Sequence, residues 1–306
     1  MAQNTYIPKS EIKRLSRRSD VMGFWLIFHV WGVIFASICM FVIWPNPLTF
    51  IAAVLIIGGR QLGLAILMHD GAHGLLFKNQ KLNAFFGQYF LAYPVGANMP
   101  SYRKYHLVHH LNTQQDNDPD LQLSAPFPVT RQSLYRKIIR DLTGQTGFKL
   151  RIGQLIMTFK QRKAATVNGD QAFSVNNIIG PYLVNLVLFL ICLLSGYWWV
   201  YFAFWLLPLF TTFQLFLRIR NIAEHALTSR DDNPLQHART TKANLLARMF
   251  VAPYWVNYHV EHHAYMYVPC WQLKALHKAM LREGHGPDME IQNSYLDVLR
   301  LAAPTT

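Results

Sequence analysis

The stretch IIGPYLVNLVLFLICLLSGYWWVYFAFWLLPLFTTFQLFL, residues 178–217, decides the fold because it contains no charged residue. A helix needs about 20 apolar residues to cross the ~30 Å hydrocarbon core of a bilayer, so this run is long enough for two crossings. Ser195-Gly196, followed by three aromatic residues, marks a turn with an interfacial anchor. The run predicts a hairpin of two membrane helices, about 178–196 and 197–217.

A second hairpin is predicted nearer the N-terminus. Residues 21–44 hold no Lys, Arg, Asp or Glu, and residues 48–68 hold only Arg60, with Pro45-Asn46-Pro47 as the turn between them. The first apolar span is too long for the core of a cleavable signal peptide. We therefore expect a single all-α integral membrane domain over residues 1–306, with four transmembrane helices in two hairpins.

The basic residues predict the orientation of these helices. The two turns near 45–47 and 195–198 hold no Lys or Arg, whereas the N-terminus, residues 98–177 and the chain after 217 hold nearly all of them. Basic loops face the cytoplasm, so both termini and a helical cap of residues 69–177 and 218–306 are expected there, in a bacterial inner membrane. The net charge of +13 then reflects topology and attraction to anionic lipid rather than nucleic-acid binding. The three scattered cysteines form no thiolate metal motif.

Nine of the thirteen histidines fall in four short clusters on this cytoplasmic side. Imidazole is the commonest metal ligand in proteins. On a helix, residues spaced i, i+3 and i+4 share one face, so we expect each cluster to aim its rings at a common point. The clusters read His69-Asp-Gly-Ala-His73, His106-Leu-Val-His109-His110, Asn221-Ile-Ala-Glu-His225 and His259-Val-Glu-His262-His263.

The number of ligands favours two metal ions. A zinc site needs three or four donors, whereas nine imidazoles suffice for two ions with open positions. Nitrogen donors without thiolates suit iron or copper. Carboxylates near the clusters could accept the second ring N–H of a ligand, with solvated surface charges as the alternative. These candidates are Asp70, Glu224 and Glu261, and Asp116, Asp118 and Asp120 in the loop after the second cluster.

In this order, the clusters resemble the histidine boxes of the membrane fatty-acid desaturase superfamily, which includes acyl-lipid, acyl-CoA and sphingolipid desaturases and carotenoid ketolases and hydroxylases. The family patterns H-x(3–4)-H, H-x-x-H-H and [H/Q]-x-x-H-H match residues 69–73, 106–110 and 259–263, and the resemblance covers roughly residues 21–280. It implies two iron ions that use O2 to oxidise an unactivated C–H bond to an alkene or an alcohol.

The same resemblance implies roles for single residues. His225 would be the ninth histidine ligand, and Asn221 would hold a metal-bound water. One iron would take His69, His73 and His109 together with His225 or residues of the last cluster, and the other iron would take the remaining imidazoles.

Departures from the family patterns narrow the expectation. Three residues separate the histidines of the first box, as in acyl-lipid desaturases and carotenoid ketolases, and the last box begins with His259 rather than Gln. The chain has no cytochrome b5 His-Pro-Gly-Gly motif, so we expect electrons from a separate ferredoxin, rubredoxin or cytochrome b5-like carrier. The family's Leu-Pro-x-x-His lacks its Pro at 273–277, which makes His277 an outer or surface residue rather than a ligand.

The sequence therefore predicts an O2-dependent di-iron desaturase acting on a lipid acyl chain within the membrane. The alternatives are a hydroxylase or ketolase of a lipid, alkane or carotenoid, and a metal-binding transporter. A transporter needs polar ligands along a path through the bilayer, whereas these spans hold only His29 and Arg60.

Four features stay outside this prediction. Arg60, about 13 Å before His69 along a helix, either extends to the membrane surface or lines a substrate channel. Residues 84–94 form a re-entrant or interfacial helix, or ordinary packing. The basic segment 131–163 rests on lipid headgroups, with Asp141 and Gly144 in a turn. The isolated His29, His237 and His285 are ordinary imidazoles.

Overall fold

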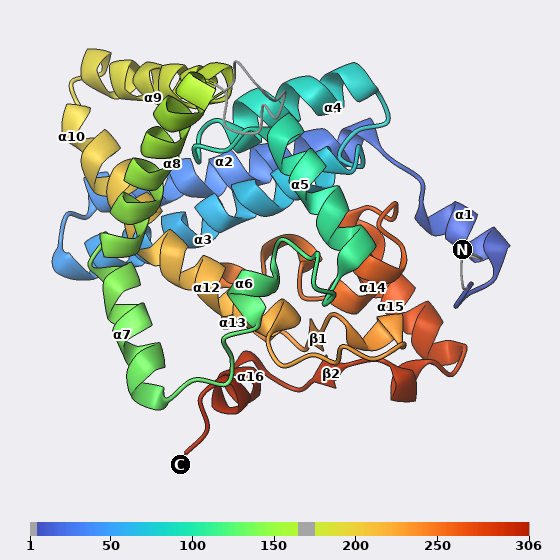
Figure 1. The fold of residues 1–306 in the computed structure, drawn as a ribbon. Coiled ribbons are helices and arrows are strands. Elements are labelled where there is room, and N and C mark those ends of the chain that lie inside the picture. The colour runs from blue at the N-terminus through green and yellow to red at the C-terminus, as the bar shows by residue number, and fades with distance from the viewer. Residues whose placement is uncertain (1–4, 165–174, 306) are drawn as a thin grey trace.

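The computed structural model describes residues 5–164 and 175–305, and it is built almost entirely from helices (Figure 1). The N-terminal two thirds begins with a short helix and continues with the long apolar helices and the connections between them. Its elements are α1 (Lys9–Leu15), α2 (Asp20–Ile43), α3 (Pro47–Ala72), α4 (Gln80–Phe86), η1 (Gly87–Ala92), α5 (Met99–Asn112), α6 (Leu121–Ser124), α7 (Arg131–Leu142), α8 (Gln145–Ala164), α9 (Val175–Leu194), α10 (Trp198–Val200), η2 (Tyr201–Leu206), α11 (Leu207–Phe210) and α12 (Thr212–His225).

The C-terminal third consists of short helices and one parallel pair of two-residue strands, which joins Thr240 to Ile291 and Thr241 to Gln292. Its elements are η3 (Pro234–Gln236), β1 (Thr240–Thr241), α13 (Leu245–Phe250), η4 (Pro253–Trp255), α14 (His259–Ala264), η5 (Cys270–Gln272), α15 (Leu273–Arg282), η6 (Gly286–Asp288), β2 (Ile291–Gln292) and α16 (Tyr295–Ala302).

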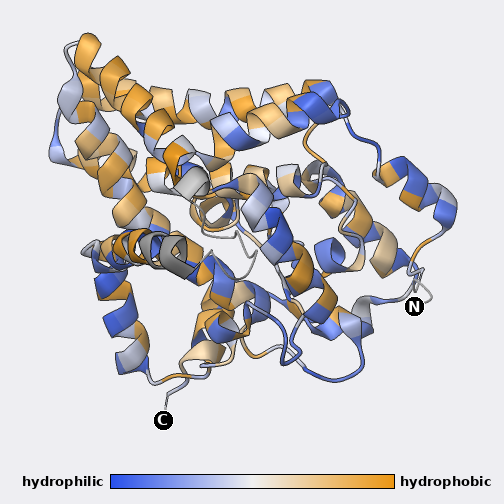
Figure 2. Cartoon of the chain, turned by 45° about the horizontal axis from the view of Figure 1, so that its top comes forward, coloured by the Kyte–Doolittle hydropathy of each residue, from blue (hydrophilic) through white to orange (hydrophobic). Residues whose placement is uncertain are grey.

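Three helical stretches are long and apolar enough to cross a membrane: α2, α3 and the continuous run Trp198–His225. They coincide with three of the four predicted spans. The fourth, predicted at 178–196, falls on α9. The apolar part of α9, Ile178–Leu194, is shorter than each of these three stretches. That crossing and the orientation in the membrane stay predictions. Figure 2 shows the long helices mostly hydrophobic and the N-terminal helix α1 mostly hydrophilic.

Both predicted turns are present. Asn46 caps α3 by accepting hydrogen bonds from the N–H groups of Leu48 and Thr49, and the Thr49 side chain accepts from the N–H of Asn46. This reciprocal capping box fixes where α3 begins. Gly196 has φ +79°, a left-handed conformation that glycine adopts without a Cβ clash. It turns the chain from α9 into the run that ends at His225.

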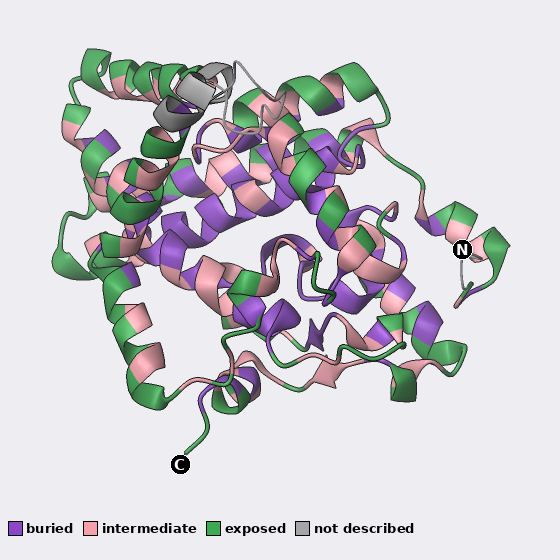
Figure 3. Cartoon of the chain, in the orientation of Figure 1, coloured by how far each residue is buried: buried purple, intermediate pink, exposed green. Residues whose placement is uncertain are grey.

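Helix α3 is the centre of the fold and is buried over most of its C-terminal half, as Figure 3 shows. Glycines on α3 let neighbouring segments come close. A Cβ on Gly58 would lie 2.1 Å from Oγ1 of Thr212, and one on Gly59 would lie 2.6 Å from the carbonyl oxygen of Met249. Helices α12 and α13 therefore contact the backbone of α3, which sets the position of the histidine segments that follow them.

Two smaller predictions were also tested by the fold. Residues 84–92 of the predicted 84–94 are helical, as the end of α4 and the π-helix η1, and η1 packs against α3. Gly144 has φ +78° in the turn between α7 and α8, as predicted. Asp141 lies in the last turn of α7 and is fully buried, where it accepts a 2.8 Å hydrogen bond from Nη2 of Arg218.

Candidate metal centre

The four histidine segments lie on helices and meet at one place. His69 lies in the last turn of α3 and His73 is its C-cap, the second cluster lies on α5, His225 ends α12, and the last cluster forms most of α14. The predicted i, i+4 pair His69 and His73 does share a face, with ring centroids 4.9 Å apart. Helices distant in sequence therefore bring all nine clustered imidazoles together, in two groups.

Five imidazoles form the first group, and their ligand nitrogens all lie within 4.8 Å of one another. Nε2 of His110 lies 2.9 Å from Nε2 of His106 and 3.0 Å from Nε2 of His262. Two nitrogens bound to one metal ion at about 2.1 Å are about 3 Å apart when their bonds are at right angles. The members of the first group are His69, His73, His106, His110 and His262.

The first group also contains unpartnered nitrogens. Within residues 5–164 and 175–305, both ring nitrogens of His69 and Nε2 of His73 are buried without a hydrogen-bond partner. Buried polar atoms rarely lack a partner unless an ion or water belongs there. These nitrogens, together with the nitrogen–nitrogen contacts of about 3 Å, fit a metal ion at the centre of the group.

The second group combines imidazoles with a carboxylate and joins two overlapping sets that share His225: His109, His225 and His263 in one, and Glu224, His225 and His259 in the other. Nε2 of His259 lies 2.8 Å from Nε2 of His225 and 3.2 Å from Nε2 of His263, and His109 is grouped with these last two. Oε2 of Glu224 lies 3.4 Å from the same Nε2 of His259. That separation is about the one expected for two ligand atoms at a tetrahedral angle around one ion.

Each histidine triplet contributes to both groups, so the expectation that a triplet aims at one point is wrong. His106 and His110 belong to the first group, whereas His109 lies against His225 with ring centroids 4.7 Å apart. The last cluster divides in the same way, since only His262 joins the first group. The reason is helical geometry: residues i and i+4 share a face, but adjacent residues diverge by about 100°. The implied grouping of His109 with His69 and His73 is corrected accordingly.

Burial keeps His73 and His110 neutral. It lowers the pKa of His73 to about 4, with the nearby Arg103 guanidinium adding to the effect. It lowers the pKa of His110 to about 2, helped by neighbouring histidines. A neutral imidazole keeps the nitrogen lone pair that a metal ion requires, so near pH 7 the site offers ligands rather than positive charges.

Two rings of the second group are oriented by acceptors outside it. Nδ1 of His109 lies 2.7 Å from Oδ1 of Asp118, and Nδ1 of His225 lies 3.1 Å from the carbonyl oxygen of His237. An acceptor at Nδ1 leaves Nε2 free to face the ion. Burial alone would raise the pKa of Asp118, but the contact with His109 and two backbone N–H groups hold it below its ordinary value.

The other candidate carboxylates have different partners. Oδ1 of Asp70 is 3.7 Å from Nδ1 of His69, too far for a hydrogen bond, and its Oδ2 accepts from the N–H of Cys270 at 2.8 Å. The fully buried Glu261 contacts His277 and accepts from Oγ1 of Thr240 at 2.5 Å. Asp116 is almost fully exposed, and Asp120 hydrogen-bonds Tyr105.

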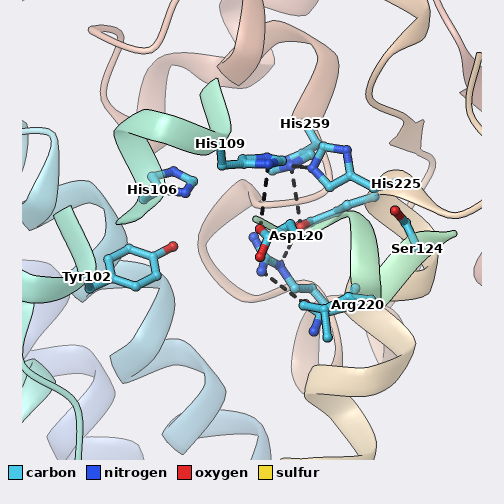
Figure 4. Close-up of a pocket in the computed structure, with 11 residues that line it drawn as sticks. Tyr102, His106, His109, Asp120, Ser124, Arg220, His225 and His259 are labelled. Carbon is cyan, nitrogen blue, oxygen red and sulfur yellow. Dashed lines mark hydrogen bonds and ion pairs between the residues drawn. The ribbon is translucent and has the colours of Figure 1, made fainter. Parts of the chain in front are cut away.

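A small cavity of about 30 Å³ borders the second group (Figure 4), which is above the roughly 10–15 Å³ that a cavity needs to hold a water molecule. The half-buried Asn221, the residue implied to hold a water, lines it. Nε of Arg220 donates to Oε1 of Glu224 at 2.6 Å, and its Nη1 donates to Oδ1 of Asn221 at 3.3 Å.

Sequence reasoning missed two residues of this site. One is Arg220, which had a signal because it lies four residues before the predicted Glu224, next to His225. Tyr102 also lines the cavity, with its ring stacked on His106 at 5.1 Å and an interplanar angle of 15°. Tyr102 also had a signal, since it lies four residues before His106 and so shares a face of α5 with it.

Comparison with known proteins gives a consistent set of relatives. A family model described as fatty acid desaturase matches residues 44–291. A dihydrorhizobitoxine desaturase from Bradyrhizobium elkanii is 29% identical over 290 residues, covering 89% of this chain and 79% of its own length. A beta-carotene ketolase from a Paracoccus species is 25% identical over 272 residues, covering 87% of this chain and 94% of its own length. A zeaxanthin 4-ketolase from Chlamydomonas reinhardtii is 23% identical and covers 87% of this chain but 53% of its own.

Proposed function

Because the chain belongs to the fatty acid desaturase family, we propose that it is an O2-dependent di-iron desaturase that introduces a double bond into a lipid acyl chain. The observation that carries the proposal is the pair of ligand groups. The first is one set of five imidazoles with unpartnered nitrogens, and the second is a pair of overlapping sets that share His225 and include a carboxylate.

The two groups give a ligand assignment for each iron. We assign the first iron to the five imidazoles of the first group. The second iron would take the four remaining imidazoles, an oxygen of Glu224, and a water held by Asn221 in the adjoining cavity. The second set is His109, His225, His259 and His263. Nitrogen ligands without thiolates suit iron, and bound iron supplies the O2-dependent oxidation of an unactivated C–H bond.

The surrounding residues position these ligands. Asp118 and the carbonyl group of His237 fix two rings through Nδ1, and Arg220 holds Glu224 by its other oxygen. Such outer contacts raise ligand basicity and fix ring orientation. His277 fixes Glu261 on the histidine-bearing helix α14 and so acts on the ligands indirectly.

A ketolase or hydroxylase is the second candidate function. Three carotenoid ketolases that match this chain favour it, since each covers 87% of this chain. A desaturase is favoured by the family description and by the desaturase relative, which has the higher identity. Either reaction needs electrons, which we assign to a separate ferredoxin, rubredoxin or cytochrome b5-like carrier at the cytoplasmic face of a bacterial inner membrane.

The proposal is tested by expressing the chain in a host with simple lipids and analysing those lipids by mass spectrometry, with and without O2. A desaturase gives acyl chains lighter by two hydrogens, only with O2 and only in cells with the active chain. Added oxygen would support a hydroxylase instead, and oxygenated carotenoids in a pigment-producing host would support a ketolase. The inactive comparison is His262→Ala. Its matched control is His285→Ala, which changes a histidine that is far from both ligand groups in sequence and lies near Asp288.

A further inference from the structure

Arg60 is a buried charge that the metal centre does not use. It lies near the middle of α3 with 7% of its surface exposed. Its Nη2 donates to the carbonyl oxygens of Arg248 at 3.3 Å and Met249 at 2.6 Å, and its guanidinium lies 5.7 Å from the ring centre of Tyr254. Its Nε is buried without a partner among the described residues. Arg60 therefore does not extend to a membrane surface, and its hydrogen bonds are incompletely satisfied.

The charge of Arg60 also lacks a counter-charge. No ion pair joins it to any carboxylate in residues 5–164 and 175–305. Carbonyl dipoles and an aromatic face supply only partial negative charge. A cation buried in an apolar part of a protein is costly unless it is paired, and charges within membrane helices usually have a function. A bound anion would supply the negative charge that the described residues do not.

A cavity of about 340 Å³ lies beside Arg60, within the range of roughly 300–1,000 Å³ found for small-molecule sites. Arg60 and the exposed Arg248 bring two positive charges to it, and His29 brings a third basic group. The described residues that line it include no Asp or Glu. Trp25 and Trp255 supply apolar walls, so the lining of the cavity combines cationic and aromatic side chains.

The wall of the cavity is held in an unusual backbone conformation. Tyr254 and Trp255 have φ 53° and 59°, the left-handed region that aromatic residues rarely adopt. Such strain persists only where the surroundings impose it, and it concentrates at ligand sites. Here Nδ1 of His29 lies 2.9 Å from the Tyr254 hydroxyl, which ties this strained segment to helix α2.

We propose that this cavity binds the anionic oxygen group of an amphiphile, a carboxylate or a phosphate, between Arg60 and Arg248. Trp25 is 54% exposed on α2, a helix long and apolar enough to cross the membrane, so the cavity has a wall at a lipid-facing surface. The apolar chain of the ligand lies along Trp25 and Trp255. The site is separate from the metal centre, since His69 lies about 13 Å further along α3 and on its opposite face.

Tryptophan fluorescence tests the site directly, because bromine atoms on a bound chain quench nearby indoles. The full chain is purified in neutral detergent, stripped of lipid, and titrated with a brominated fatty acid and with the brominated alcohol of equal length. A Trp25→Phe/Trp255→Phe double variant is titrated in parallel. The difference in quenching between the wild-type protein and this variant reports binding at the cavity. We expect the acid to bind at least about tenfold more tightly than the alcohol, and Arg60→Met to remove that difference.

Two variants and two further probes complete the test. Arg248→Gln should weaken acid binding several-fold, and Arg131→Gln, on α7, should leave it unchanged. Brominated phosphatidylglycerol binding more tightly than the acid would assign the anion to a phospholipid headgroup. Equal binding of acid and alcohol to the wild-type protein would overturn the proposal even if Arg60→Met fails to fold. Inorganic phosphate binding as tightly as either amphiphile would also overturn it.

Discussion

The two ligand groups of the metal centre differ in what surrounds them. The first consists of imidazoles alone, and two of its members have buried nitrogens without partners among the described residues. The second adds the carboxylate of Glu224, the Arg220 guanidinium that holds it, and a water-sized cavity lined by Asn221. We propose that the carboxylate and the site for water make the second group the one where ligands exchange. The centre is therefore asymmetric, although each histidine triplet serves both groups.

Removing a ligand of the first group should have the largest effect. His262→Ala deletes the only residue that α14 gives to this group, so we expect activity to fall more than about 100-fold, since even outer partners of metal ligands cost about 10–100-fold. Iron per chain should fall towards one. His285→Ala is the control and should keep both values. Unchanged turnover in His262→Ala would remove that residue from the site.

Neutralising Glu224 should affect the second ion alone. Glu224→Gln leaves the partly buried Arg220 without its ion-pair partner, and breaking a fully buried pair costs about 3–5 kcal/mol, which sets the upper limit here. We expect a lower melting temperature and loss of one iron, with the first ion retained. Asp116→Asn, at a carboxylate that is 95% exposed, is the matched control. Loss of both irons at equal rates would contradict the asymmetry.

Asp118→Asn tests the contact between Asp118 and the His109 ring, and its expected effect is smaller than that of Glu224→Gln. The amide can still accept from His109, but it carries no charge to strengthen that contact. We expect the affinity for the second iron to fall about 10-fold, at the lower end of the range for outer-contact variants. Iron retention during titration with a chelator measures it. An identical chelation curve for the variant would show that Asp118 does not act on the metal.

The smallest effect is expected at Asn221. Asn221→Ala removes a polar wall of the cavity but no direct ligand, so both irons should stay bound while activity falls several-fold. Metal analysis and turnover on the same preparation separate the two outcomes. Loss of iron in this variant would make Asn221 a direct ligand rather than a holder of water.

Much of this arrangement was readable from local sequence. The uncharged runs and the turns at Asn46 and Gly196 predicted the hairpins, because apolar length and turn chemistry are local properties. The i, i+4 spacing of His69 and His73 predicted their shared face. The divergence of adjacent histidines by about 100° is also a local property, but which group each histidine joins depends on where α5 and α14 lie relative to each other. The partnership of His277 with Glu261 depends on the fold of the C-terminal third in the same way.

The central claim is two unlike iron sites in one chain. Mössbauer spectroscopy of the purified protein, reduced and enriched in 57Fe, tests it together with total metal analysis. The account predicts about two irons per chain and two distinct ferrous signals of equal area, of which Glu224→Gln changes one. One zinc per chain without iron would contradict the account, as would a single iron signal that Glu224→Gln leaves unchanged.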